Sequence, residues 1–180
     1  MEFKYQKPEV VFQGGRIDVL SVETEHPQGG VVRREVVAHP GAVVILPMLD
    51  PKTVILIRNE RFVVQQTLWE LPAGTLEKAE EPGMCAEREL QEETGYRSKK
   101  IVPLLDFFST PGFCNEVLYV YHAQDLVHVG QSLDETEKIV VETVRFSTAL
   151  KMIQEGIIRD AKTICALLYF HTYCKNGFLY

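Results

Sequence analysis

Four glutamates crowd one short stretch of the chain, and their spacing suits a divalent cation. Glu80, Glu89, Glu92 and Glu93 fall within GTLEKAEEPGMCAERELQEETGY, residues 74–96. In a helix from about Pro82 to Thr94, Glu89 and Glu93 would emerge from one face, a single turn apart. Carboxylates at that distance repel one another, most strongly where water is excluded. A bound Mg2+ or Mn2+ would turn this repulsion into attraction, because hard divalent ions take carboxylate and phosphate oxygens as ligands.

A glutamate run is often only a solvated helix face, but the residues around this one count against that interpretation. Gly74 precedes Glu80 by six positions, Arg88 follows eight later, and Arg88 opens the run RELQEETG. This spacing resembles the signature of the Nudix hydrolases, G-x5-E-x7-R-E-U-x-E-E-x-G-U, in which U is aliphatic. Tyr96 departs from it at the last position, where a tyrosine can fill an apolar site and leave its hydroxyl at the rim.

The resemblance implies a metal site. It makes Glu89 and Glu93 the main carboxylate ligands, Glu92 a further ligand or a water-mediated partner, and the backbone oxygen of Ala73 another ligand. Gly74 would let the backbone bend so that this oxygen faces the cation. We expect Arg88 to order the site by bonding Glu77 or Glu80, while Glu80 itself is either such a partner or a solvated loop residue. The implied cofactor is Mg2+ or Mn2+.

The chemistry that these ions serve is cleavage of a diphosphate. Its negative charge repels a hydroxide nucleophile, so catalysis needs charge neutralisation, a water of lowered pKa and a stabilised leaving group. A carboxylate outside the helix would then take the proton from water. The branch of the family acting on ADP-ribose places its base on a mobile loop here, and this implies Glu135, with Glu137 as the second choice; a solvated turn is the plain alternative.

A second resemblance concerns the substrate. Pro111 stands sixteen residues after Gly95, in the loop STPGFCNE, as in the pyrophosphatases of ADP-ribose and nucleoside diphosphate sugars. The segments RRE at 33–35, HPGAV at 39–43, Arg58 to Arg61 and WELP at 69–72 also look like that branch. The implied substrate-binding residues are Arg34, Arg61, Glu70, Pro111 and Phe113. Arg61 is the candidate for the diphosphate or a ribose, because a planar guanidinium suits phosphate oxygens. Phe113 could instead belong to the loop core, and Tyr5 and Phe12 could either stack on a base or pack within the N-terminal region.

The rest of the sequence must position these groups, and we expect an α/β (α+β) fold of two parts. Residues 1–40 read as a small antiparallel β-sheet with strands at 10–12, 16–22 and 31–37, separated by Gly-Gly and Pro-x-Gly turns. So thin a sheet would gain by packing on another subunit, as the resemblance also implies, so we predict a homodimer through these strands. Residues 41–180 would form the Nudix hydrolase domain, an α/β/α sandwich around a mixed sheet.

Within that domain we expect four strands and three helices. Continuous apolar runs predict buried strands at 42–46 and 53–57, with a turn at 49–52, and further strands are expected at 117–121 and 139–146. After the acidic helix, Ser147 should cap a helix over 148–155 that ends at Gly156. Asp160 should cap a longer helix from Ala161 to about Cys174, packed on the sheet through Ile164, Leu167, Leu168 and His171.

Composition narrows the functional classes. The net charge of −6 and the absence of lysine and arginine clusters disfavour nucleic acid and anionic membrane as partners. No apolar run approaches the ~20 residues of a membrane span, and the N-terminus has no signal-like stretch. Four cysteines without C-x-x-C pairing indicate a reduced, cytoplasmic protein.

Together these features predict a metal-dependent hydrolase that splits ADP-ribose or a similar nucleotide sugar into a nucleoside monophosphate and a sugar phosphate. One alternative is a Nudix hydrolase of dinucleotides or nucleoside triphosphates, against which the Pro111 loop counts. The other is a non-catalytic nucleotide-sugar sensor, against which the complete set of glutamates counts.

Overall fold

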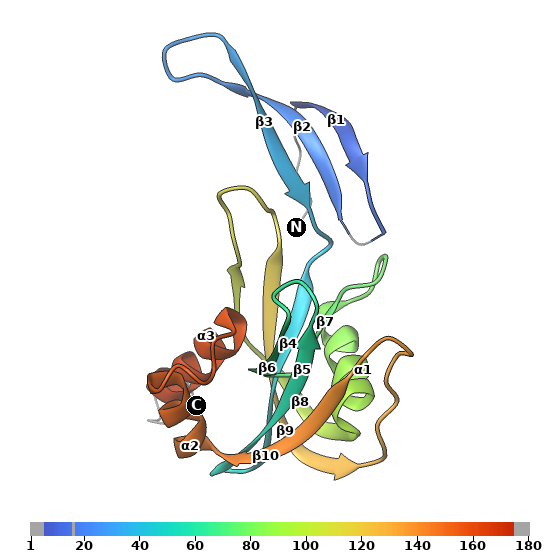
Figure 1. The fold of residues 1–180 in the computed structure, drawn as a ribbon, viewed down its shortest axis with the longest axis vertical. Coiled ribbons are helices and arrows are strands. Elements are labelled where there is room, and N and C mark those ends of the chain that lie inside the picture. Colours follow the sequence, from blue (N-terminus) through green and yellow to red (C-terminus); the bar gives the residue numbers. More distant parts are fainter. Residues whose placement is uncertain (1–5, 16, 175–180) are drawn as a thin grey trace.

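The computed structural model describes residues 6–15 and 17–174, which form a small sheet standing on a larger layered body (Figure 1). The small sheet has three antiparallel strands in the order β1 (Gln6–Gln13), β2 (Asp18–Glu25) and β3 (Val31–Ala38). β2 and β3 pair along their whole length, from Asp18 opposite Ala38 to Glu25 opposite Val31. Gly29 and Gly30 both have positive φ in the turn between them, which explains why glycine stands there. The small antiparallel sheet expected from the sequence is therefore confirmed.

The body contains a mixed sheet of seven strands. They are β4 (Ala42–Asp50), β5 (Thr53–Arg61), β6 (Gln66–Glu70), β7 (Ala73–Thr75), β8 (Tyr96–Phe108), β9 (Val117–His128) and β10 (Ile139–Arg145). The main order is β10-β5-β4-β9-β8, with β4 parallel to β9 and all other pairs antiparallel. β4 is shared at one edge, because residues 42–44 pair with β7 whereas Met48 and Asp50 pair with β5. This division sets β7 beside the ends of β5 and β6, where the candidate site lies.

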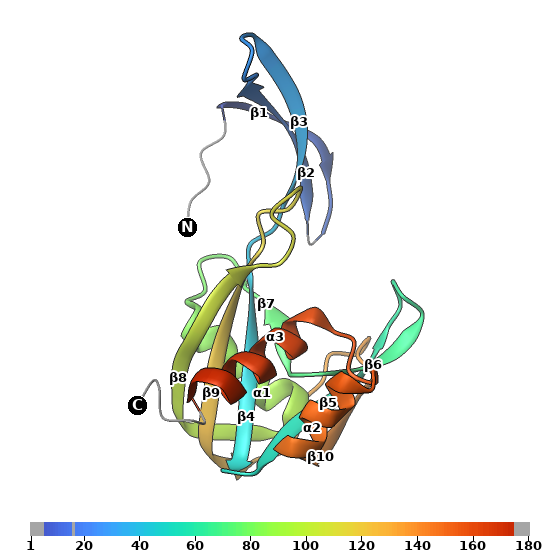
Figure 2. The same ribbon diagram turned by 90° about the vertical axis from the view of Figure 1, so that its left-hand side faces the viewer.

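Helices cover both faces of this sheet, as Figures 1 and 2 show. α1 (Pro82–Thr94) covers one face; α2 (Phe146–Gln154), α3 (Ala161–Tyr169) and the π-helix η1 (Phe170–Cys174) cover the other. Alternate residues of β4 serve the two cores, Val43 and Ile45 with α1 and Val44 and Leu46 with α2 and α3. Each such fully buried aliphatic side chain contributes about 1.5–3 kcal/mol. The expected α/β/α sandwich is confirmed, and no helix within the described residues could cross a bilayer.

β8 is a long strand that was not expected from the sequence. Its segment YRSKKIVPLLDFF carries polar residues in its first half and a proline in the middle, so no continuous apolar run marks it. β8 is an edge strand of the sheet, where one backbone side needs no partner, and its pairing with β9 is irregular between Pro103 and Leu105. A proline is tolerated at such an irregular edge position.

The C-terminal helices differ from the expectation in three details. α2 begins at Phe146, with Arg145 rather than Ser147 at its N-cap, because the Phe146 side chain is buried and its N–H donates to the Lys52 carbonyl at 2.8 Å. α3 does start after an Asp160 cap, but the α-helix ends at Tyr169 and continues as η1. Its buried residues are Thr163, Ala166 and Leu167, whereas Leu168 and His171 of the expected stripe are exposed.

Candidate active site

The acidic helix α1 spans the residues expected, because both of its ends are encoded locally. Pro82 occupies the first turn, where its missing N–H costs nothing. Gly95 ends the helix in the left-handed conformation (φ 75°), and its N–H donates to the Gln91 carbonyl at 2.8 Å. A Cβ on Gly95 would also lie 2.8 Å from the backbone nitrogen of Gln131. Glycine is thus required here both by the turn and by the segment that follows β9.

Glu93 is the most deeply placed carboxylate of the helix. The residue is 2% exposed, and its carboxylate Oε2 accepts a hydrogen bond from the Ala73 N–H at 2.8 Å. Burial, together with the negative charges of Glu89 and Glu137, raises the pKa of Glu93 to about 8. One backbone hydrogen bond therefore does not offset the cost of a buried charge.

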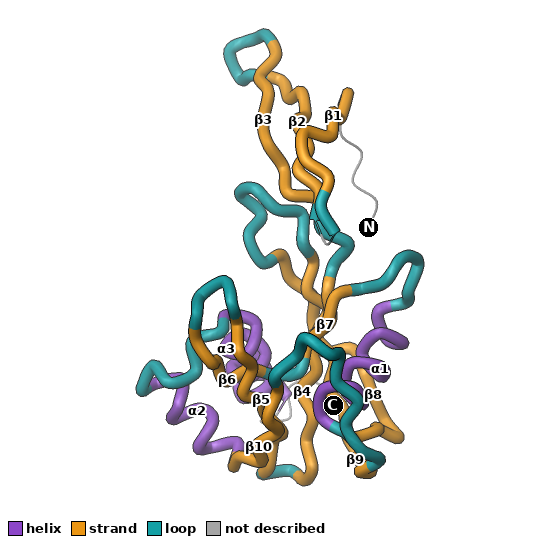
Figure 3. The backbone as a smooth tube through the Cα atoms, turned by 45° about the vertical axis from the view of Figure 1, so that its right-hand side comes forward, coloured by secondary structure: helices purple, strands orange, loops and turns teal. Residues whose placement is uncertain are grey.

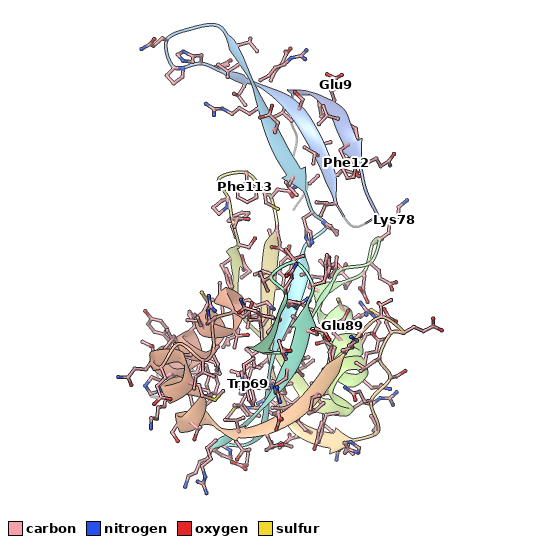
Figure 4. All side chains as sticks on the ribbon, viewed as in Figure 1. Glu9, Phe12, Trp69, Lys78, Glu89 and Phe113 are labelled. Carbon is pink, nitrogen blue, oxygen red and sulfur yellow. The ribbon has the colours of Figure 1, made fainter. Side chains whose placement is uncertain are left out.

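Glu89 lies one turn earlier on the same buried face, turned toward the strands (Figure 4). Burial raises its pKa, against the opposing influence of Arg88. Its carboxylate lies directly against Gly74: a Cβ at that position would come within 1.9 Å of both Cδ and Oε1 of Glu89. Gly74 does not have a positive φ, so the reason for glycine is this close approach and not the backbone bend that we expected.

Arg88 ties the outer carboxylates together. Its guanidinium donates two hydrogen bonds to Glu80, each 3.0 Å, and its Nη1 also reaches Glu89 Oε1 at 2.6 Å and Glu92 Oε2 at 2.9 Å. The hydrogen bonds from Arg88 lower the pKa of Glu80 to about 2. Of the two loop glutamates considered for Arg88, the structure gives it Glu80, while the Glu77 N–H donates to the Glu80 carboxylate at 2.9 Å. Arg88 is placed to orient carboxylates.

These residues fit a hard divalent cation in kind. The donors are oxygen atoms, two of the carboxylates are buried with raised pKa values, and Gly74 keeps the space beside Glu89 free of a side chain. Within the part of the chain that the structure describes, no three His, Cys, Asp or Glu side chains are already gathered as a ready metal site. Arg88 donates hydrogen bonds to both Glu89 and Glu92. A cation would therefore have to compete with this guanidinium.

The loop before β10 runs beside α1 (Figure 3), held by hydrogen bonds to the end of the helix. Gln131 Nε2 donates to the Glu93 carbonyl at 2.7 Å, and the Ser132 N–H donates to the Glu92 carbonyl at 3.1 Å. Farther along, Glu137 is half-buried and its charge raises the pKa values of both Glu89 and Glu93. Glu135 is exposed. The geometry thus brings Glu137, our second choice, toward the carboxylates.

Glu70 and Arg61 belong to an ion-pair network on the other side of β7. Glu70 is completely buried and accepts from Arg61 Nε at 2.8 Å, Arg61 Nη2 at 2.7 Å and Lys162 Nζ at 2.6 Å. Burial alone would raise the pKa of Glu70, but hydrogen bonds and charges from Arg61 and Lys162 outweigh it and leave that pKa lowered. Glu70 therefore acts through its two cations and has no exposed surface for a substrate. Lys162, ninety-two positions away, was not singled out from the sequence, and no short-range pattern marks it.

The remaining expected substrate residues meet in a second place. Arg34, Pro111 and Phe113 line a cavity of about 660 Å³ between the small sheet and the loop joining β8 to β9. This loop is fixed to the end of β3, since the Val37 N–H donates to the Phe113 carbonyl at 2.7 Å and the Asn115 N–H to the Val37 carbonyl at 3.2 Å. Phe113 itself is exposed near the tip of the loop (Figure 4). Phe12 is exposed on β1, and Tyr5 lies outside the described residues.

Known proteins are similar to this chain over nearly its whole length. The chain is 39% identical over 171 residues to an ADP-ribose pyrophosphatase of Bacillus subtilis, covering 94% of this chain and 92% of the relative. It is 35% identical over 170 residues to a methanol dehydrogenase activator of Bacillus methanolicus, covering 93% and 92%. The crystal structure of an ADP compounds hydrolase shares the fold, with a TM-score of 0.79 over 99% of this chain and 100% of that one at 24% identity. The NUDIX domain profile matches residues 38–167, and the chain belongs to the Nudix family.

Proposed function

We propose that this protein hydrolyses the diphosphate bond of ADP-ribose or a related nucleoside diphosphate sugar and releases a nucleoside monophosphate and a sugar phosphate. The observation that carries the proposal is the pair of buried carboxylates, Glu89 and Glu93, beside a glycine that leaves room for one of them. The ADP-ribose pyrophosphatase of Bacillus subtilis, which is similar over nearly the whole chain, supports the choice of substrate class.

The cofactor in this proposal is Mg2+, with Mn2+ as its substitute. Glu89 and Glu93 would hold it, together with Glu92 and the backbone oxygen of Ala73. When bound, the cation neutralises diphosphate charge and lowers the pKa of the attacking water. Arg88 would keep Glu89 and Glu92 oriented, because its hydrogen bonds to the two carboxylates fix the direction in which they face the cation.

The hydrolytic step needs a proton acceptor. The water oxygen forms a new bond to one phosphorus, the bridging P–O bond breaks, and its electron pair leaves with the departing phosphate. We assign the proton to Glu137, because its charge acts on Glu89 and Glu93 and it stands on the loop beside α1. Glu135, the first choice from the sequence, remains the alternative acceptor.

The substrate would extend between two regions. Arg61 faces the carboxylates closely enough for its charge to lower the pKa of Glu93, so we place the diphosphate near it. The cavity lined by Arg34, Pro111 and Phe113 would take the nucleoside. Val10, Val11 and Phe12 are exposed on β1, and this apolar surface supports a homodimer formed through residues 1–40, with residues 41–180 as the hydrolase domain. A cytoplasmic location remains part of the proposal.

A substrate panel tests the proposal. ADP-ribose, GDP-mannose, UDP-glucose, dinucleotides and nucleoside triphosphates would each be incubated with the purified protein and Mg2+, and the products separated by chromatography. We expect AMP and ribose 5-phosphate from ADP-ribose as the fastest reaction. Faster hydrolysis of a dinucleotide or a triphosphate would show that the proposed substrate class is wrong. Binding without turnover of any diphosphate would favour the non-catalytic sensor instead.

A further inference from the structure

A cavity of about 320 Å³ opens beside the candidate metal site, on the side of β7 that faces α3. Its lining includes Arg61, Ala73, Gly74, Ser109, Glu116 and Lys162. Ala73 also donates to Glu93, and the charge of Arg61 acts on Glu93, so the cavity adjoins the carboxylates. A group bound here would be within reach of the reacting diphosphate.

Lys162 is the cation in this cavity that the sequence did not reveal. Its side chain is 14% exposed, and Nζ donates to Glu70 Oε2 at 2.6 Å and to Asp160 Oδ1 at 2.9 Å. An ammonium group has three N–H donors, so two protein partners leave one for a ligand. Because the side chain is already held in place, binding through that third donor costs little further loss of side-chain freedom.

Glu70 brings Lys162 and Arg61 together. The two cations would repel if placed side by side alone, but each bonds the same buried carboxylate. Arg61 spends Nε and Nη2 on Glu70, and its side chain remains 40% exposed. The first turn of α3 adds to the positive character, because the first N–H groups of a helix have no partner within the helix, and Ala161 and Lys162 of this turn both line the cavity.

Asp160, one of the two acidic side chains of the lining, is already occupied. Asp160 accepts from Lys162, from the Thr163 N–H at 3.0 Å and from the Thr163 hydroxyl at 2.6 Å. Glu116, the other, lies 3.5 Å from Nδ1 of His39, but this nitrogen accepts from the Gly41 N–H at 3.1 Å, so a neutral His39 donates no hydrogen bond to Glu116 there. The donors left over are those of Lys162, Arg61 and the helix end, which is the set that recognises a phosphate.

We propose that this cavity binds the sugar-phosphate half of the substrate and that Lys162 contacts its phosphate. The inference rests on the proposed function. It places the nucleoside half and the sugar-phosphate half of the substrate on different sides of the loop that joins β8 to β9. Ser109 and Glu116 of that loop line this cavity, whereas Pro111 to Asn115 line the larger one assigned to the nucleoside. Glu70 and Asp160 are positioning residues, since they touch Lys162 and not the ligand.

Binding of ribose 5-phosphate and of ribose to the metal-free protein tests this assignment without catalysis. Calorimetry would compare the wild type with K162Q, K162R and K151Q, the last at an exposed lysine of α2 that pairs with Glu155. We expect K162Q to weaken the binding of ribose 5-phosphate by tenfold or more, because a charge-assisted hydrogen bond is lost. The affinity for ribose should stay unchanged. K162R should keep most of the affinity and K151Q all of it.

A second measurement uses only the wild type, in case K162Q does not fold. Ribose 5-phosphate at saturation should slow chemical acetylation of Lys162, read by mass spectrometry, and leave Lys151 as reactive as before. An unchanged Lys162 rate, or a K162Q variant that keeps its preference for ribose 5-phosphate over ribose, overturns the inference. Neither result depends on whether any diphosphate is hydrolysed, so failure here is distinct from failure of the proposed function.

Discussion

Replacing Gly74 by alanine should damage activity far more than stability. The new Cβ would lie 1.9 Å from the Glu89 carboxylate, whereas ordinary contact begins at 3.4 Å, so the carboxylate must retreat by 3.4 − 1.9 = 1.5 Å. Misplacing a catalytic group by about 1 Å can cost ~100-fold. We therefore expect kcat/KM to fall by roughly two orders of magnitude, equivalent to about 2.7 kcal/mol of transition-state stabilisation.

Stability should respond weakly to the same change, because the clash involves the end of a side chain. Moving Glu89 gives up its hydrogen bond from Arg88, a partly exposed pair worth about 1 kcal/mol at most. Alanine also restricts the unfolded chain, which returns about 0.4–1 kcal/mol. The free energy of unfolding in urea should thus change by less than about 1 kcal/mol.

Gly83 offers the matched control within α1. A Cβ there would meet Tyr121 Oη at 3.8 Å, an ordinary contact, so G83A should keep the wild-type kcat/KM and gain about 0.5–1 kcal/mol of stability. Hydrolysis of ADP-ribose and urea unfolding would be measured on both variants. Wild-type kcat/KM in G74A would refute the reasoning, since it would mean that the position of the Glu89 carboxylate does not matter.

Three further changes test other parts of the site and of the core. E93Q should abolish most turnover and keep the fold, because it removes ligand charge at constant volume. Near-wild-type turnover, with an unchanged circular dichroism spectrum, would rule out Glu93 as a metal ligand. E137Q should lower kcat more than E135Q without changing Mg2+ affinity, and the reverse order would restore Glu135 as the base. The pKa of His122 is lowered to about 4, first by burial and then by the charge of Lys100, so the folded protein holds this ring neutral while the unfolded chain protonates below about pH 6.5. The contribution of His122 to the free energy of unfolding is therefore complete above that pH and is lost as the pH falls toward 4. H122F cannot take up this proton, so between about pH 7 and pH 5 it should lose about 2 kcal/mol less stability than the wild type. The same pH dependence of urea unfolding in both proteins would contradict this.

Residues with local signals were predicted well. The ends of α1 were found because Pro82 and Gly95 act within one turn of the helix. β4 and β5 were found because both faces of their central residues are buried, which leaves a continuous apolar run. The crowding of Glu89 and Glu93 on one face followed from the helical repeat alone.

Features that depend on distant contacts were missed or left open. The meeting of Lys162 with Glu70 joins α3 to β6 across ninety-two positions, and neither residue has a neighbour in sequence that signals the other. The choice between Glu135 and Glu137 was left open, because it depends on how the loop before β10 lies against α1, where Gln131 and Ser132 donate hydrogen bonds to the end of the helix. The reason for Gly74 was likewise a side chain fifteen positions later and not its own backbone angle.

The contacts of Arg88 suggest what Arg88 and Glu80 would do in the proposed cation site, where neither is a proposed ligand. Arg88 carries one positive charge and bonds three carboxylates, but it gives its bidentate contact to Glu80 and only Nη1 to Glu89 and Glu92. Glu80 is thus the main hydrogen-bond partner of the guanidinium, as the lowering of the Glu80 pKa to about 2 also indicates. Without its hydrogen bonds to Glu80, Arg88 could make a bidentate contact with Glu89 and neutralise its charge. A divalent ion would then find a carboxylate that is already fully paired. Glu80 thus keeps Glu89 oriented yet only partly compensated, the condition under which a cation can displace a guanidinium.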